Sequence, residues 1–173
     1  MIFVTVGTTE FDSLIRAMDT LAPTFDEPVV MQVGRGLARP QHAAAWFDFA
    51  PSLEPYYRQA NVVVSHGGLG TMVEVIRSGG RLVGVSNPEL YDRHQEDLLA
   101  SFERAGHLVW CRSLADLPDA IAAARVQTFA RYSEPPCEIH TAIGHYLAGL
   151  RAGRLDSGRR RRNFRRIEAS YKD

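Results

Sequence analysis

The chain has 173 residues, of which 45% are apolar, and this is enough to fold one globular domain around a substantial core. Twenty basic residues balance 20 acidic ones, no apolar run approaches the roughly 18 residues of a membrane span, and no secretory leader precedes the first predicted strand. The two cysteines, Cys111 and Cys137, have no metal-like spacing. These features argue against secreted and membrane-spanning proteins, and we expect a cytoplasmic protein with reduced thiols.

Apolar runs alternate with helical patterns along the chain. We predict strands at residues 2–6, 29–33, 46–49, 61–65, 82–85 and 107–111, and helices at 11–22, 54–59, 69–78, 92–105, 114–124 and 138–150. This alternation is typical of βαβ units. The continuously apolar runs Ile2–Val6 and Val62–Val64 suit strands that are covered on both faces. The expected fold class is therefore α/β, with a single Rossmann-like, doubly wound parallel sheet of about six strands.

Charge is distributed unevenly between two parts of the chain. Residues 151–173 contain nine basic and three acidic side chains, whereas residues 1–150 contain 11 basic and 17 acidic ones. We therefore expect one domain at 1–150 and a basic tail at 151–173. Phe164, Ile167 and Tyr171 are spaced so that the tail could form a basic amphipathic helix on an anionic membrane or on a partner. A solvated, disordered tail is the alternative, and an RNA-binding arm has no recognisable module to support it.

Two loops of the predicted sheet favour phosphate binding. The commonest order of six strands is 3-2-1-4-5-6, and ligands bind beyond the carboxyl ends of the strands where this order reverses. The reversal lies between the first and fourth strands, which are followed by a first loop, Gly7-Thr8-Thr9, and a second loop, Ser65–Gly70. This topology makes the two loops neighbours. Free backbone N–H groups and the positive end of a helix dipole at the second loop favour an anion there.

The stretch from the second loop into the following helix carries the stronger signal. Gly67, Gly68 and Gly70 would let a bulky anion approach the backbone. Thr71 could donate its hydroxyl, and His66 could bind a phosphate or partly neutralise it. The alternative interpretation is a glycine-rich turn with a capping histidine.

The first loop carries a weaker signal, because it lacks the lysine and the glycine spacing of a P-loop. Gly7 and Thr8 could contact a phosphate, or the segment could be a tight turn in which Thr9 caps the following helix. Its predicted place beside the second loop favours the phosphate-binding interpretation.

Further polar groups are expected at the same edge of the sheet. Glu74 lies one turn into the helix after the second loop, where it could accept both hydroxyls of a ribose or simply complement the helix dipole. Asp92, His94 and Gln95 follow the fifth strand in a long polar loop and suit the recognition of sugar hydroxyls. The alternative for this loop is a solvated helix start that Asp92 caps.

Other chemistries find less support in the sequence. The histidines lack zinc-ligand spacing, no Asp-x-Asp motif supports a divalent-metal site, and no nucleophile elbow is present. We therefore expect no metal and no cofactor, and no nucleic-acid partner. The aromatic residues in the middle of the chain are expected in the core or in a pocket for a base, and they are Trp46, Phe47, Phe49, Tyr56 and Tyr57.

Taken together, the motifs resemble a known family. They are Phe3–Thr9 with Phe11-Asp12, Ser65–Gly70, His94-Gln95 and Gly106–Leu108. They resemble the PssE-type subunits that make exopolysaccharide, and the soluble subunit of the split UDP-N-acetylglucosamine transferase of the dolichol pathway. Both are similar to the C-terminal half of MurG-like, GT-B glycosyltransferases. The resemblance covers residues 1–150.

The resemblance implies a role for each matched residue. Gly7 and Thr8, with the stretch from His66 to Thr71, would hold the diphosphate of a UDP-sugar, and Glu74 would bind its ribose. Phe49 and Ala50 would lie near the uracil. Asp92-Arg93-His94-Gln95 resembles the Asp-Arg-Gln-Gln of MurG-like enzymes, so His94 and Gln95 would contact the donor sugar. Histidine replaces the first glutamine of that motif, which leaves the identity of the sugar open.

The resemblance also implies a partner. GT-B enzymes have two Rossmann-like domains, and in the split systems the acceptor-binding half is a separate, membrane-anchored subunit. We therefore expect the donor-binding subunit of an inverting glycosyltransferase, peripheral at the cytoplasmic face of the membrane, that acts on a polyprenyl-diphosphate-linked acceptor in polysaccharide biosynthesis. His66 would be catalytic by stabilising charge on the leaving diphosphate. A non-catalytic nucleotide-sugar-binding regulatory module is the alternative.

Overall fold

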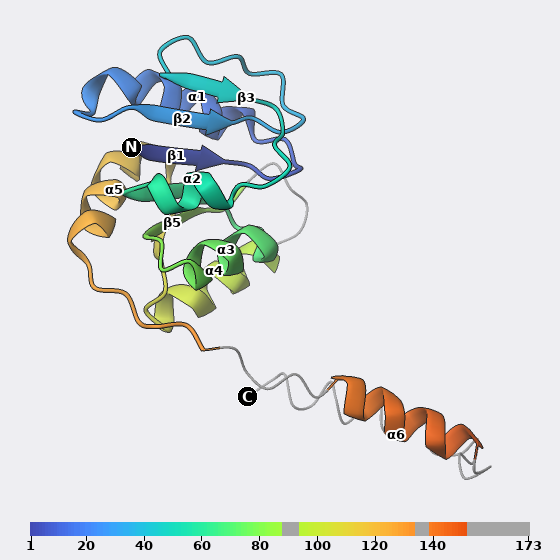
Figure 1. Ribbon diagram of the computed structural model, residues 1–173. Helices are drawn as coiled ribbons and strands as arrows, with labels where there is room; N and C mark the ends of the chain where they lie inside the picture. Colours follow the sequence, from blue (N-terminus) through green and yellow to red (C-terminus); the bar gives the residue numbers. More distant parts are fainter. Residues whose placement is uncertain (88–93, 134–138, 152–173) are drawn as a thin grey trace. The chain divides into compact units, whose positions relative to one another are not determined.

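The computed structural model describes residues 1–87, 94–133 and 139–151, and the chain divides into two compact units, Met1–Tyr132 and Ser133–Asp173. The first unit is built on a six-stranded, all-parallel sheet (Figure 1). Its strands are β1 (Ile2–Thr5), β2 (Val29–Gln32), β3 (Ala45–Phe47), β4 (Val62–His66), β5 (Leu82–Val85) and β6 (Val109–Cys111). Their order, β3-β2-β1-β4-β5-β6, confirms the predicted fold class and places the reversal between β1 and β4.

Helices connect the strands of the first unit. They are α1 (Asp12–Leu21), α2 (Glu54–Gln59), α3 (Leu69–Arg77), α4 (His94–Arg104) and α5 (Leu117–Val126), with 3-10 turns η1 (Ala22–Thr24) and η2 (Leu114–Asp116). The single helix predicted at 114–124 is wrong in its start: η2 precedes α5, which begins with Leu117 and Pro118. Proline suits a first helical turn because it has no N–H to leave unpaired there.

The side chains of the strands alternate between two cores. Ile2 and Val4 are fully buried in the core that α1 and α5 cover. Phe3, between them in sequence, points to the opposite face, where α2, α3 and α4 supply the other core. Burial on both faces explains why β1 and β4 are continuously apolar rather than alternating. Trp46 differs from the expectation of a core residue, because β3 is an edge strand and leaves it 40% exposed.

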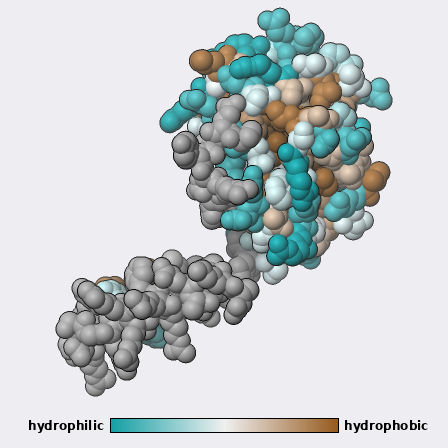
Figure 2. Space-filling view, turned by 180° about the vertical axis from the view of Figure 1, so that it is seen from behind, coloured by the Kyte–Doolittle hydropathy of each residue, from teal (hydrophilic) through white to brown (hydrophobic). Residues whose placement is uncertain are grey.

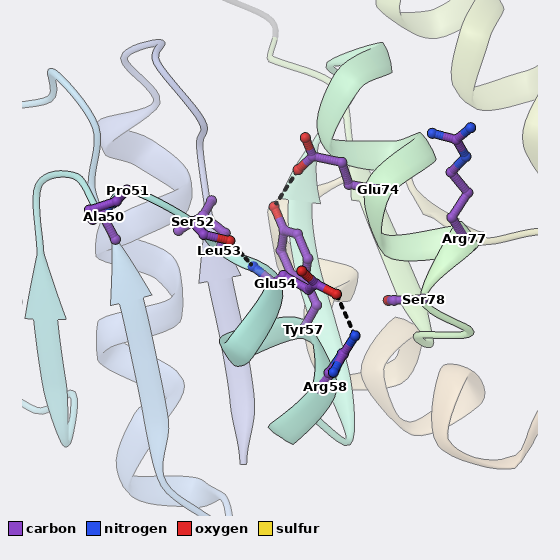
Figure 3. Close-up of a pocket in the computed structure, with 10 residues that line it drawn as sticks. All are labelled: Ala50, Pro51, Ser52, Leu53, Glu54, Tyr57, Arg58, Glu74, Arg77 and Ser78. Carbon is purple, nitrogen blue, oxygen red and sulfur yellow. Dashed lines mark hydrogen bonds and ion pairs between the residues drawn. The ribbon is translucent and has the colours of Figure 1, made fainter.

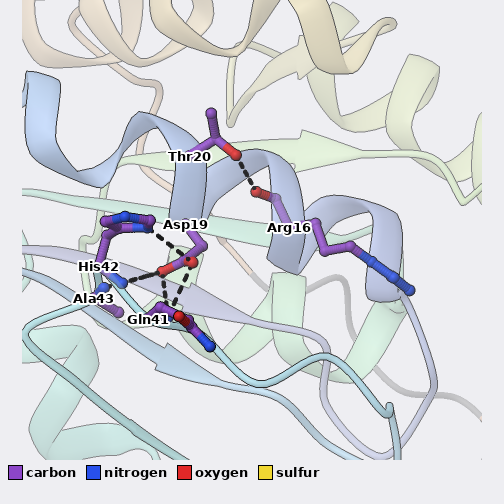
Figure 4. Close-up of polar contacts among 6 residues, drawn as sticks. All are labelled: Arg16, Asp19, Thr20, Gln41, His42 and Ala43. Atoms are coloured by element: carbon purple, nitrogen blue, oxygen red, sulfur yellow. Dashed lines mark hydrogen bonds and ion pairs between the residues drawn. The ribbon is translucent and has the colours of Figure 1, made fainter.

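Two carboxylates of α1 hold the long connection between β2 and β3. Asp12 accepts hydrogen bonds from the backbone N–H groups of Leu37 and Ala38. Asp19, about two turns further along the helix, accepts from the N–H groups of residues 41–43 and contacts the ring of His42 (Figure 4). Burial opposes ionisation of Asp19, but the three backbone donors outweigh it and lower the pKa of this carboxyl below its usual value. The connection is thereby anchored at both ends of α1.

The surface of the described residues is mixed in polarity. Figure 2 shows hydrophobic side chains that reach the surface in patches among hydrophilic ones. Large exposed apolar side chains of the first unit include Leu37 and Phe49, in the connections that follow β2 and β3, and Leu69 at the start of α3. Among the described residues, no helix combines the length and the apolar content that crossing a bilayer requires.

The second unit contains helix α6 (Ile139–Arg151), close to the helix predicted at 138–150. Ile143, Tyr146 and Leu147 are about half exposed and share one face of this helix, because they are spaced three and four residues apart. The boundary between the two compact units follows Tyr132. The limit of the main domain that was predicted at residue 150 stays a prediction. The predicted basic tail, 151–173, lies outside the described residues apart from Arg151.

Candidate functional site

The first and second loops meet at the carboxyl edge of the sheet, as the topology predicted. Gly7 lies so close to His66 that a Cβ atom on Gly7 would be 2.9 Å from Cε1 of the imidazole and 3.6 Å from Oγ1 of Thr71. A Cβ atom on Gly68 would overlap Nε2 of the same ring. The imidazole of His66 therefore lies between the two loops, and only glycine at positions 7 and 68 leaves room for it. Gly7 also has φ of 61°, a conformation that favours glycine.

A cavity of about 370 Å³ opens at this junction. Nine of its lining residues are site residues predicted from the sequence: Gly7, Thr8, Phe49, Ala50, His66, Gly68, Gly70, Thr71 and Glu74. The other three lining residues are Gln32, Leu53 and Tyr57. The structure thus brings together the groups that were assigned to a diphosphate, a ribose and a base, although they come from three different segments of the chain.

The polar groups of the two loops are divided between internal bonds and the cavity. The N–H of Gly7 donates to Oγ1 of Thr5, so it serves the turn itself. Thr9 does not cap α1: its hydroxyl donates to the carbonyl of Val6, and the helix begins at Asp12. Helix α3 begins at Leu69, immediately after Gly68, and the first N–H groups of a helix have no partner within it. The start of α3 therefore supplies the hydrogen-bond donors and the positive dipole end for an anion.

His66 is an uncharged polar group in this setting. Its side chain is only 6% exposed, and within the described part of the chain its Nδ1 atom has no hydrogen-bond partner of normal geometry. Burial lowers the pKa of the imidazole below its ordinary value, and an interaction with the backbone of Thr5 works in the opposite direction. The ring is therefore neutral at pH 7. The role of His66 toward a phosphate, by hydrogen bonding or by partial neutralisation, stays a prediction.

The lowered pKa of His66 makes stability depend on pH. The unfolded chain binds this proton more readily than the folded one, so the free energy of unfolding falls as the pH drops from 7.5 through 6.5, the ordinary pKa of histidine. We expect His66→Gln to lose less stability than the wild type between pH 7.5 and 5.5, because glutamine does not titrate. Urea unfolding at the two pH values measures this difference. Equal losses in the two proteins would contradict the buried, neutral state of His66.

Glu74 is paired with Tyr57, and both residues line two cavities. The hydroxyl of Tyr57 donates to Oε2 of Glu74 at 3.4 Å (Figure 3). Burial, followed by the charge of Glu74, raises the pKa of Tyr57 well above its ordinary value, so the phenol stays protonated and remains a donor. Beyond this pair lies a second, open cavity of about 760 Å³, which Glu54, Arg58 and Arg77 also line. Tyr57 was expected only as a core or base-pocket residue, and the sequence gives no signal for its bond to Glu74.

Gln32 is a site residue that the sequence analysis missed. Its side chain is 1% exposed and lines the 370 Å³ cavity. Oε1 accepts from the hydroxyl of Thr5 at 2.6 Å, and Nε2 donates to the carbonyl oxygens of Gly7 and Asp48 at 2.8 and 2.6 Å. A polar residue at the end of an otherwise apolar strand was the available signal, because a buried amide must find partners.

Four predicted site residues do not line the cavity of about 370 Å³ or lie outside the described residues. A Cβ atom on Gly67 would be 3.0 Å from Leu99, so this glycine packs against α4 rather than lining the cavity. Gln95 lies in the first turn of α4, and its Oε1 accepts from the N–H of Asn87. His94 begins α4, and Asp92 lies outside the described residues. The donor-sugar roles of Asp92, His94 and Gln95 stay predictions.

Comparisons with known proteins agree with this geometry. Residues 1–131 match the sequence family of the glycosyltransferase family 28 C-terminal domain. The human UDP-N-acetylglucosamine transferase subunit ALG13 is 34% identical over 122 residues, which cover 64% of this chain and 11% of the human protein. The chain therefore spans about a tenth of the length of this relative.

Two solved structures share the fold. An NMR solution structure of ALG13 superposes with a TM-score of 0.53 and 17% identity, covering 84% of this chain and 94% of that one. The crystal structure of Acinetobacter baumannii MurG superposes with a TM-score of 0.58 and 16% identity, covering 82% of this chain and 48% of that one. At these identities the likeness concerns the Rossmann-like fold.

Proposed function

Because the chain belongs to the glycosyltransferase family 28 C-terminal domain family, we propose that it is the donor-binding catalytic subunit of a two-component inverting glycosyltransferase. The donor is a UDP-sugar, and the acceptor is a polyprenyl-diphosphate-linked sugar in polysaccharide biosynthesis, as in the PssE-type systems. The observation that carries the proposal is the imidazole of His66, held between Gly7 and Gly68 at the start of α3. This arrangement suits a diphosphate that bears developing negative charge.

The binding mode follows the cavity from one end to the other. The diphosphate occupies the end formed by Gly7, Thr8, His66 and Gly68, where the N-terminus of α3 points. Glu74, fixed by Tyr57, accepts hydrogen bonds from the ribose hydroxyls. Phe49, Ala50 and Leu53 line the remaining part of the cavity and leave space for the base.

Charge stabilisation is the catalytic contribution of this chain. An acceptor hydroxyl attacks C1 of the sugar from the face opposite the diphosphate, the bond from C1 to the diphosphate oxygen breaks, and UDP leaves with the electron pair. The hydroxyl proton passes to a base on the partner chain. Preorganised donors at the start of α3 and the neutral ring of His66 stabilise the leaving group, and removing one such donor typically costs about 2.7–4 kcal/mol of barrier.

The partner is a membrane-anchored chain that supplies the acceptor-binding half. Its support is the name of the human relative, which describes that protein as a UDP-N-acetylglucosamine transferase subunit. This partner would hold the chain at the cytoplasmic face of the membrane. The fold itself permits many functions, so the proposal depends on the residues of the site rather than on the fold.

Transfer assays with the two chains separate and combined test the proposal. We expect the purified chain to bind UDP but to transfer sugar from a UDP-sugar to a polyprenyl-diphosphate-linked acceptor only when the membrane-anchored partner is present. His66→Ala should slow transfer by about 100-fold or more and weaken UDP binding much less. Full activity of the chain alone would contradict the two-component proposal. Binding of a UDP-sugar with no transfer in the combined assay would favour the regulatory alternative.

A further inference from the structure

We propose that Gln32 is a positioning residue that sets the distance between the diphosphate end and the base end of the cavity. The inference rests on the proposed function, and it concerns a residue that touches the walls of the site rather than the reacting atoms. The observation behind it is a buried amide that binds the backbone of the first loop, at Gly7, and the backbone of the connection that follows β3, at Asp48.

The first loop and the connection that follows β3 come from strands that are not neighbours in the sheet. Gly7 follows β1, whereas Asp48 follows the edge strand β3, and β2 lies between them in the sheet. Gln32 is the last residue of β2, so its side chain lies between the first loop and the connection that follows β3. Its Nε2 atom uses both of its hydrogens, one on the carbonyl of Gly7 and one on the carbonyl of Asp48.

The orientation of the amide is itself determined by a neighbour. The hydroxyl of Thr5 donates to Oε1 of Gln32 at 2.6 Å, and the same hydroxyl oxygen accepts the N–H of Gly7 at 3.2 Å. The oxygen of the amide must therefore face Thr5, and the nitrogen must face the two carbonyls. Gly7, Thr5, Gln32 and Asp48 form one connected network, and such a buried network is rigid when all of its members are paired.

The network determines where two parts of a nucleotide can sit. Gly7 is at the diphosphate end of the cavity, and Asp48 immediately precedes Phe49 and Ala50 at the base end. A ligand that spans both ends binds more tightly when the distance between the ends is fixed. Once one part of the ligand is bound, the other part is already held beside its own site. A ligand that touches only one end gains nothing from it. Gln32 therefore contributes to the binding of a whole nucleoside diphosphate more than to the binding of its parts.

The test compares UDP with inorganic pyrophosphate on variants of the full chain, with NMR titration for both ligands and thermal unfolding for stability. We expect Gln32→Met to weaken UDP binding by about tenfold or more and pyrophosphate binding by less than about threefold. Gln32→Leu is a second variant of similar size that loses both donors without adding a charge. It should show the same selective loss.

Val29→Ala is the matched control, because Val29 is 2% exposed at the opposite end of β2. It should lower the unfolding temperature and leave both affinities unchanged. Equal losses of UDP and pyrophosphate binding in the Gln32 variants, or no loss of either, would overturn the inference and leave the proposed function intact. A wild-type chain that binds neither ligand would overturn both.

Discussion

Gly68→Ala is expected to weaken UDP binding by about one to two orders of magnitude. A Cβ atom at this position would overlap Nε2 of His66, and it would also lie 2.9 and 3.0 Å from two carbon atoms of the ring. The imidazole packs against Gly7 and lines the cavity of about 370 Å³, so any shift of the ring changes the wall of that cavity. The ring or the start of α3 must therefore shift out of the geometry that is proposed to receive the diphosphate. Isothermal titration with UDP measures the loss of affinity.

Gly70→Ala is the matched control for this substitution. Gly70 lies in the same glycine-rich stretch and lines the same cavity, but a Cβ atom there would meet nothing within 4 Å. We expect this variant to keep the NMR signals of the His66 ring, and a slightly higher stability because alanine favours a helix over glycine. UDP binding at wild-type strength by Gly68→Ala would show that the imidazole has no part in receiving the diphosphate.

Glu74→Ala is expected to weaken UDP binding by about 10- to 150-fold and pyrophosphate binding hardly at all. The reason is that hydrogen bonds to a charged group contribute about 1.5–3 kcal/mol, and Glu74 is the carboxylate of the cavity that can accept from ribose hydroxyls. Parallel titrations with UDP and with pyrophosphate separate the ribose contribution from the diphosphate contribution.

Glu54→Ala provides the comparison for the loss of a negative charge. Glu54 lies in the neighbouring cavity and pairs with Arg58, so its removal changes the local charge without touching the proposed ribose position. We expect its UDP affinity to stay within about threefold of the wild type, since exposed ion pairs contribute little. A Glu74 variant that loses UDP and pyrophosphate binding equally would assign Glu74 to general electrostatics rather than to the ribose.

Much of the architecture could be predicted because it depends on local patterns. Continuous apolar runs such as Ile2–Val6 predict strands that are buried on both faces, and the alternation with helical patterns predicts parallel pairing. Once the strand order follows the commonest topology, the neighbourhood of the first and second loops is a geometric consequence. This is why the cavity-lining residues of the first and second loops, with Thr71 and Glu74, could be predicted from patterns in the chain, whereas the place of Phe49 and Ala50 came from the family resemblance.

The remaining features depend on contacts between distant segments. The partners of Gln32 are 16 to 27 residues away in sequence, and Glu74 is 17 residues from Tyr57, so no local pattern signals these bonds. The neutral state of His66 likewise requires its actual burial, because desolvation is a property of the surroundings and not of the residue type. The sequence by itself therefore determined the strands, their order and the loops that carry the site. Only the tertiary structure decided which side chains hold those loops in place and how they are charged, because hydrogen bonding and burial are set by the packing of residues that are far apart in the chain.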